Sequence, residues 1–260
     1  MGTHFKEGFT IIETMLVLAI TGTLAVALLV GVGTSINAQR YRDSVISLKG
    51  LLQDQYAELN NVRNDRQGQQ ACGVTNNGTA YAGQSDCLLM GRYVGINDEG
   101  RITTATVIGY ESSKPIAATD VGILRDSYTL GLATNSIEEA GIEWGATITW
   151  PVSGGGSKPE GTPRSLAFLI LRSPQSGNMY TFTGDTAPIA EAVSPTFLKS
   201  LVVEGVSVPG QSQRTVCVSP TGVAVAEKLA IYIVAGANNT SGIETRSYQT
   251  ILDAGGDSKC

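Results

Sequence analysis

The stretch Gly8-Phe9-Thr10-Ile11-Ile12-Glu13 opens the apolar segment that decides the fold of this chain. From Thr14 to Ile36 there are 23 residues without a charged side chain. About 20 apolar residues are enough for a helix to cross the hydrocarbon core of a bilayer. Glu13 is a single carboxylate at the head of this run, and an ionisable group inside a membrane segment points to a function. The sequence therefore predicts a membrane helix in which Glu13 either has a partner or lies at the interface.

Residues 1–8 do not form an ordinary secretory signal. They are short and polar, and they lack the apolar core of roughly 7–15 residues that such a signal needs. The alternative is that the long apolar run is itself the core of a cleaved signal. Cleavage would then follow it, at the small residues between Gly31 and Ser35.

The segment from Lys6 to Glu13, with the apolar residues that follow it to Ile20, resembles the processing motif of type IV pilins and type II secretion pseudopilins. In that family a short leader ends in glycine, a hydrophobic residue becomes the new N-terminus, and glutamate is the fifth mature residue. The resemblance implies that a prepilin peptidase cuts between Gly8 and Phe9 and methylates the amine of Phe9. It also implies that Glu13 neutralises the N-terminal amine of a neighbouring subunit, which agrees with the rule that a buried charge is paired. The alternative is a plain membrane anchor with Glu13 at the level of the lipid headgroups.

Two features depart from the family pattern. The leader has only one Lys or Arg, Lys6, and Glu7 stands beside it, so the charge bias that orients membrane helices is weak. Major pilins often carry proline at the twenty-second mature position, which is Val30 here, and the first proline of the chain is Pro115. In lacking this proline, the chain resembles several minor pilins and minor pseudopilins.

A second apolar pattern follows the membrane segment, with spacings of four and three residues that indicate one face of an amphipathic helix. Its members are Tyr41, Val45, Leu48, Leu52, Tyr56, Leu59 and Val62. We expect a single helix from Phe9 to about Asp65, with Gly31 and Gly33 as its weak points. A heptad-based dimer is the alternative for the second half, although the run spans barely three heptads.

Residues 67–260 predict a β-rich head with a glycine- and asparagine-rich loop over 67–86. Asn97-Asp98-Glu99-Gly100 predicts a hairpin turn, and 165–171 is apolar throughout, as in a central strand. A short helix is expected at 195–202, capped by Ser194 or Thr196. The expected strands are 88–96, 101–110, 128–132, 142–152, 165–171, 179–183, 215–219, 223–226, 229–235 and 245–252.

The expected fold class is α+β: a long N-terminal helix, half transmembrane and half amphipathic, packed on a C-terminal antiparallel β-sandwich-like head. The domains are a leader (1–8), a transmembrane or filament-core helix (9–34), the amphipathic half of the same helix (35–66) and the head (67–260). The hairpin predicted from Cys217 to Gly222 also has a short likeness to the tails of minor pilins and minor pseudopilins.

Four cysteines, Cys72, Cys87, Cys217 and Cys260, suggest disulfides outside the cytoplasm and allow three connectivities. We expect Cys72–Cys87, which closes a short loop, and Cys217–Cys260, which ties down the C-terminal tail. The alternative is that some of them are free buried thiols. No two cysteines form a CxxC pair and the only histidine is His4, so a zinc site is not expected.

No catalytic arrangement is evident, and we do not expect an enzyme. His4 belongs to the leader, so the processed chain has no histidine for a catalytic triad. The glycine run at 154–156 lacks the spacing of a phosphate loop. Glu138 and Glu139 predict a solvated turn, and Asn239-Thr240-Ser241 matches a glycosylation sequon but fits any surface loop.

No cofactor is expected either. Calcium at Asn97-Asp98-Glu99 is an alternative to a plain turn, although the full acidic spacing is missing. The net charge of −5 speaks against a broad attraction to nucleic acid.

The resemblance implies a structural subunit, major or minor, of a type IV pilus or pilus-like filament. Its partners would be other pilin-like subunits, the prepilin peptidase, the inner-membrane assembly platform and the membrane itself. Before assembly it would be a single-pass membrane protein with an extracytoplasmic head; afterwards it would belong to a surface pilus or a periplasmic pseudopilus. The alternatives are a minor pseudopilin of a type II secretion system and a membrane-anchored adhesion module that never polymerises.

Overall fold

The computed structural model describes residues 10–60, 87–113, 117, 119–150, 162–189, 192–205, 213–220 and 228–247. Contacts divide the chain into two compact units, residues 1–40 and 41–260. The domain boundary expected at residue 34 falls shortly before this division. The boundary expected at residue 66 lies outside the described residues.

A single helix, α1, runs from Ile11 to Asn60 and is continuous through Gly31 and Gly33. This confirms the prediction that the membrane segment and the amphipathic segment form one helix. The expected first residue, Phe9, and the expected end near Asp65 lie outside the described residues.

The carboxyl-terminal part of α1 belongs to the head, and its predicted apolar face is buried there. Each side chain of that face through Leu59 is at most 4% exposed, whereas Ile46, on the same helical stretch, is 60% exposed. The four-and-three spacing therefore located the packed face correctly. Its last predicted member, Val62, lies outside the described residues.

The larger of two antiparallel sheets has the strand order β3-β2-β1-β6-β7, and β4 pairs with the other half of the β2 edge. The predicted hairpin turn at Asn97–Gly100 joins β1 to β2, with Gly100 at a φ of 80° that suits glycine. The strands are β1 (Leu88–Ile96), β2 (Arg101–Glu111), β3 (Tyr128–Leu132), β4 (Glu138–Gly141), β6 (Leu166–Arg172) and β7 (Met179–Gly184).

The smaller sheet has the order β10-β9-β8-β5. Its strands are β5 (Thr147–Thr149), β8 (Arg214–Ser219), β9 (Leu229–Ile233) and β10 (Ile243–Ser247). With the larger sheet, these strands give the antiparallel β head of an α+β fold, as expected.

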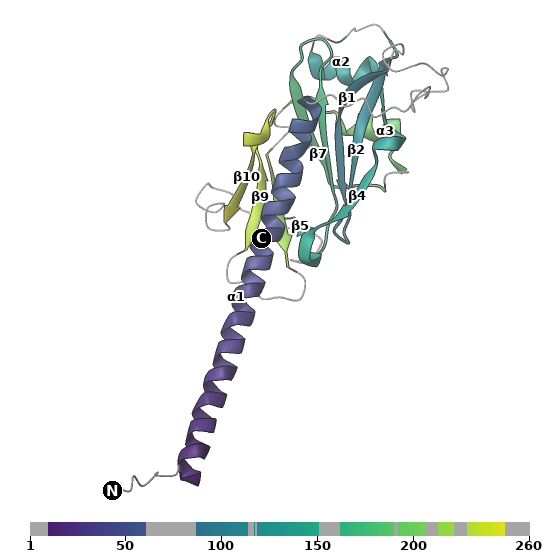
Figure 1. The fold of residues 1–260 in the computed structure, drawn as a ribbon. Coiled ribbons are helices and arrows are strands. Elements are labelled where there is room, and N and C mark those ends of the chain that lie inside the picture. Colours follow the sequence, from purple (N-terminus) through teal and green to yellow (C-terminus); the bar gives the residue numbers. More distant parts are fainter. Residues whose placement is uncertain are drawn as a thin grey trace, which may run out of the picture. The chain divides into compact units, whose positions relative to one another are not determined.

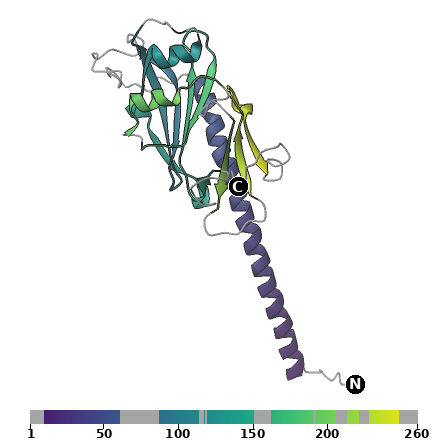
Figure 2. The same ribbon diagram turned by 180° about the vertical axis from the view of Figure 1, so that it is seen from behind.

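The larger sheet is buried on both faces. On its inner face Phe168 and Ile170 of β6 join the apolar face of α1 and the smaller sheet in one core. On its outer face Leu169 and Leu171 pack with α2 (Asp120–Asp126) and α3 (Pro195–Leu201). Figures 1 and 2 show α2 and α3 on the side of this sheet away from α1. This two-sided burial explains the continuous apolar run that predicted a central strand.

The short helices are set by their caps. Ser194 caps α3 by accepting a hydrogen bond from the Phe197 amide at 3.1 Å, as one of the two predicted options required. Thr119 caps α2 in the same way. Sequence reasoning missed α2, because its 7 residues are too few to show a helical period.

The predicted strand over 142–152 is wrong for its first part. A 3₁₀ turn, η2 (Glu143–Gly145), occupies that part, and among the described residues of the segment Thr147–Thr149 forms the strand. Trp144 and Gly145 have φ values of 58° and 66°, in the left-handed region, which no strand can accommodate.

Glu138 and Glu139 were also predicted wrongly as a turn. They begin β4, whose side chains are all exposed, so the charge pattern is that of an edge strand. The last strand, β10, begins at Ile243, two residues before the expected start at Thr245. The predicted strand over 223–226 and residues 248–252 lie outside the described residues.

Candidate functional site

The first turn of α1 brings Thr10 and Glu13 together. The Glu13 amide donates a hydrogen bond to the Thr10 hydroxyl at 3.3 Å, and the Thr14 amide donates to the Thr10 carbonyl at 3.1 Å. Thr10 is thus the N-terminal cap, and Glu13 stands at the third position of the helix, where a capping box would place a glutamate. The positive end of the helix dipole favours a carboxylate in this turn.

Among the described residues, the Glu13 carboxylate has no hydrogen bond or ion pair. The other predicted processing residues, Gly8 and Phe9, lie outside them. The carboxylate is therefore open to a partner that the described part of the chain does not supply.

The threonine hydroxyls of the apolar segment are hydrogen-bonded to the backbone of their own helix. The hydroxyls of Thr14, Thr21, Thr23 and Thr34 each donate to a backbone carbonyl three or four residues earlier, at distances of 2.8 to 2.9 Å for the shortest bond of each. Such back-bonding leaves only the methyl and methylene surface of the side chain to face outward. Glu13 is consequently the one strongly polar side chain between Ile11 and Thr34.

The apolar segment is exposed around its whole circumference. Ile11, Leu18 and Leu29 each expose more than 70% of their surface, and no side chain from Ile11 to Ile36 is buried. A helix that is hydrophobic all round belongs in lipid or within a larger protein assembly. The helix is long and apolar enough to cross a membrane near the N-terminus of the chain.

Polar contacts fix the carboxyl-terminal part of α1 to the smaller sheet. The Tyr41 hydroxyl accepts from the Leu229 amide at 2.7 Å and donates to the Val218 carbonyl at 2.9 Å, so it bridges β9 and the adjacent strand β8. The Gln53 side-chain amide donates to the Thr240 carbonyl at 2.8 Å. These bonds define the rotation of the helix on the sheet more narrowly than apolar packing alone would.

A buried arginine ties the same part of α1 to the larger sheet. Arg92, on the inner face of β1, donates to the Gln55 side-chain oxygen at 3.0 Å and to the Thr106 hydroxyl at 2.8 Å. It also forms an ion pair with Glu58 at 2.7 Å. Sequence reasoning missed this cluster, although Arg92 is the only charged residue within β1 and that isolation was the available signal.

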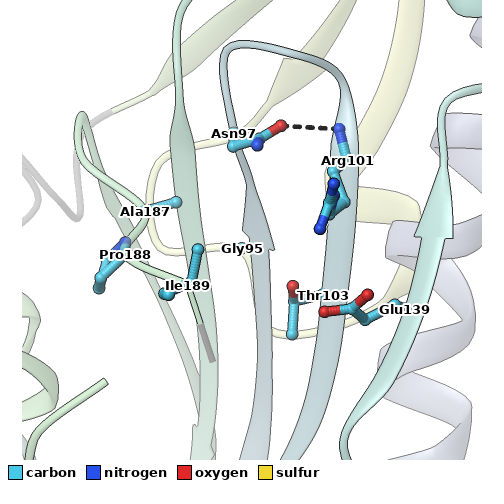
Figure 3. A pocket seen from close by; sticks show the side chains of 8 residues that line it. All are labelled: Gly95, Asn97, Arg101, Thr103, Glu139, Ala187, Pro188 and Ile189. Atoms are coloured by element: carbon cyan, nitrogen blue, oxygen red, sulfur yellow. Dashed lines mark hydrogen bonds between the residues drawn. The ribbon is translucent and has the colours of Figure 1, made fainter. Parts of the chain in front are cut away.

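A small hollow opens on the outer face of the larger sheet, beside the β1–β2 turn (Figure 3). Its empty space is about 270 Å³ with the open mouth included. It is lined by Gly95, Asn97, Arg101, Thr103, Glu139, Ala187, Pro188 and Ile189.

The Tyr93 side chain lies beside this hollow. A Cβ atom added to Gly95 would lie 2.9 Å from the Tyr93 hydroxyl oxygen, so the hydroxyl lies over that glycine. Tyr93 is fully buried, and its hydroxyl has no hydrogen-bond partner among the described residues. Buried polar groups without partners are rare in native proteins, and each needs an explanation.

The predicted calcium segment does not form a metal cluster among the described residues. The Asn97 side-chain oxygen accepts from the amides of Glu99 and Arg101, at 3.1 and 2.7 Å, and so closes the turn; Figure 3 shows the bond from Arg101. Asn239, of the sequon, similarly accepts from the Ser241 amide at 2.9 Å and caps η4 (Thr240–Gly242).

Neither described cysteine, Cys87 or Cys217, is a free thiol. Their expected partners, Cys72 and Cys260, lie outside the described residues, as does the glycine run at 154–156. The pairing therefore stays a prediction.

Comparison with known proteins returned no match: no family model fits the chain, and no curated protein or solved structure is similar to it.

The buried tyrosine predicts a loss of stability in alkali. Burial raises the pKa of the Tyr93 hydroxyl above its ordinary value of about 10. A raised folded-state pKa contributes stability that is complete below the unfolded pKa and is lost as the pH rises through the folded one. We therefore expect the free energy of unfolding to be steady up to about pH 10 and to fall above it.

Urea unfolding at a series of pH values would measure this loss of stability. In a Tyr93→Phe chain the fall above pH 10 should be shallower. An identical pH dependence in the two chains would contradict the assignment to Tyr93.

Proposed function

We propose that this chain is a structural subunit of a type IV pilus or pilus-like filament, assembled through its N-terminal helix. The observation that carries the proposal is the apolar segment at the start of α1 together with the carboxylate at its head. The apolar segment from Ile11 to Ile36 has a single carboxylate, Glu13, which has no partner among the described residues and lies four residues after the glycine–phenylalanine junction of a prepilin-type motif. In lipid such a helix is a membrane anchor, and in a filament the same surface packs against other helices.

The proposed chemistry is charge pairing. Cleavage between Gly8 and Phe9 frees an α-amino group, and the carboxylate of Glu13 is the acceptor that such a cation needs in a low-dielectric core. The four back-bonded threonines support this role, because they leave no competing polar side chain in the segment.

Mass spectrometry of the mature N-terminus tests the processing step. In a host with the assembly machinery, the chain isolated from membranes should begin at Phe9 and carry a methyl group on its amine. A Gly8→Ala chain keeps the leader's length and should remain uncleaved if the peptidase requires the glycine. An intact Met1, or a cut after Ser35, would contradict the proposal.

A minor pseudopilin of a type II secretion system is the second candidate. The absence of a proline at Val30 and the two-sheet head favour a minor subunit. Surface filaments sheared from cells would contain a pilus subunit, whereas a pseudopilin would stay with the cell envelope.

A further inference from the structure

Trp144 is both exposed and strained. Among the described residues of the head it is the one exposed aromatic side chain, with 58% of its surface accessible to solvent. Its φ of 58° lies in the left-handed region, which a tryptophan rarely adopts. Strained residues cluster at binding sites and switch regions, so an exposed aromatic residue in such a conformation calls for a functional explanation.

The turn that carries Trp144 is fixed to the head on both sides. Ile142 and Ala146 are buried, whereas the three residues of η2 between them are exposed. The Ile142 amide donates to the Gly100 carbonyl at 2.9 Å, and the Ala146 amide donates to the Glu143 carbonyl at 3.4 Å. Because the base of the turn is held in this way, little backbone ordering remains to be done when the indole ring binds a partner.

Two contacts of α1 define its direction on the smaller sheet. The Tyr41 hydroxyl bonds to the Val218 carbonyl, near the end of β8. The Gln53 side-chain amide bonds to the Ile243 carbonyl at 3.1 Å. Ile243 is level with Arg214 at the start of β8, because both pair with the last residue of β9. Going back along α1 from Gln53 to Tyr41 therefore leads toward the end of β8.

The η2 turn lies at the same end of the head as Tyr41. In β5, Thr147 pairs with Ser219, the last residue of β8, so the residues before Thr147 extend past the end of that strand. Figure 1 shows the link from β4 to β5 at this end of the head. Trp144 is therefore carried at the end of the head where the packed part of α1 begins.

The chain itself holds this end of the head close to the bilayer. The uncharged run ends at Ile36, and Tyr41 follows five residues later in the same helix. Five helical residues rise about 7.5 Å. The headgroup layer is about 5–7 Å thick on each side, since a bilayer measures roughly 40–45 Å in total and its hydrocarbon core about 30 Å. A helix that spans the membrane up to Ile36 thus places Tyr41 near the outer boundary of the headgroups.

We propose that the η2 turn docks on the surface of the bilayer in which α1 is anchored, with the Trp144 ring among the phospholipid headgroups. An indole has an apolar body and an N–H donor, which is why tryptophan concentrates at membrane–water interfaces. The exposed carboxylates of Asp98, Glu99 and Glu143 belong to this turn and to the adjoining β1–β2 turn, and they limit the ring to a shallow depth. The inference goes beyond the filament role and rests on the membrane anchoring that forms part of the proposed function.

Quenching by brominated phospholipids tests the docking, with the full-length chain inserted in phosphatidylcholine vesicles. A Trp150→Phe chain keeps Trp144 as its only tryptophan. The matched Trp144→Phe chain keeps only Trp150, whose ring lies against the core and beside the Arg214 guanidinium. Bromines close to the headgroups should quench Trp144 strongly, and bromines near the ends of the acyl chains should quench it less. Trp150 should be quenched little by either lipid.

Flotation of the same vesicles on a density gradient separates failure of the docking from failure of the anchor. A chain that floats while Trp144 emits equally in brominated and plain lipid would overturn the docking and leave the membrane helix intact. Equal quenching of the two single-tryptophan chains would also overturn it, because the effect would not belong to η2. A chain that does not float would overturn both the docking and the anchor. A change in Trp144 emission that occurs only on filament assembly would assign η2 to a subunit contact instead.

Discussion

A Leu52→Ala chain should lose about 2–5 kcal/mol of the free energy of unfolding of its head, the usual result of truncating a buried leucine. Leu52 is 1% exposed and lies in the core that α1 shares with both sheets. Removing its isobutyl group forfeits transfer free energy and leaves a cavity, because both sheets that line this core are held by their own backbone ladders. For a domain stabilised by about 5–15 kcal/mol, such a loss approaches complete unfolding.

The matched control is Ile46→Ala, on the same helix. Ile46 is 60% exposed, so the same kind of truncation should change the free energy of unfolding by no more than about 0.5 kcal/mol. Both tryptophans of the chain, Trp144 and Trp150, belong to the head, so their fluorescence during urea unfolding in mild detergent reports on it. Equal losses in the two variants would show that α1 does not pack on the head as described.

Much of this fold could be predicted because local patterns and tertiary burial agree. The four-and-three spacing from Tyr41 to Leu59 is the buried face of α1, and the apolar run at 166–171 is a strand covered on both faces. The turn at Asn97–Gly100 was recognised from its residues, because an Asn side chain that accepts backbone amides and a glycine with positive φ are local requirements.

The remainder depends on contacts distant in sequence. β1 pairs with β6 across some seventy residues, and no local pattern specifies that choice. Trp144 adopts a left-handed conformation that few tryptophans tolerate, so the strand expected there ended without a sequence signal.

Of the candidate sites, the one at the start of α1 could be predicted because it is a linear motif. The hollow could not, because it arises where residues of three strands, the β1–β2 turn and the segment after β7 meet. Glycine at 95 is unremarkable in sequence and becomes informative only because it pairs with Thr103 and lies beneath the Tyr93 hydroxyl.

Replacing Glu13 by glutamine should leave the chain processed and inserted in the membrane but reduce its incorporation into filaments by about 100-fold. Glutamine keeps the size of the side chain, and the backbone amide that bonds to the Thr10 hydroxyl is unchanged, so the first turn of α1 should stay intact. Only the negative charge is lost. An amine left unpaired in an apolar core costs about 2.5–3.5 kcal/mol on membrane-insertion scales, which corresponds to a factor of about 100 in an equilibrium.

Three variants, Glu13→Gln, Glu13→Ala and Asp43→Asn, distinguish charge pairing by Glu13 from a role of its side chain within α1. Glu13→Ala loses the charge and the polar end of the side chain but keeps the backbone amide that bonds to Thr10, and it should match Glu13→Gln if charge alone decides assembly. Asp43→Asn removes a carboxylate from an exposed position of the same helix and should assemble normally. Immunoblots of sheared filaments against membrane fractions give the ratio for each chain. Full incorporation of Glu13→Gln would refute charge pairing, whereas a defect confined to Glu13→Ala would show that assembly needs the polar side chain and not its charge.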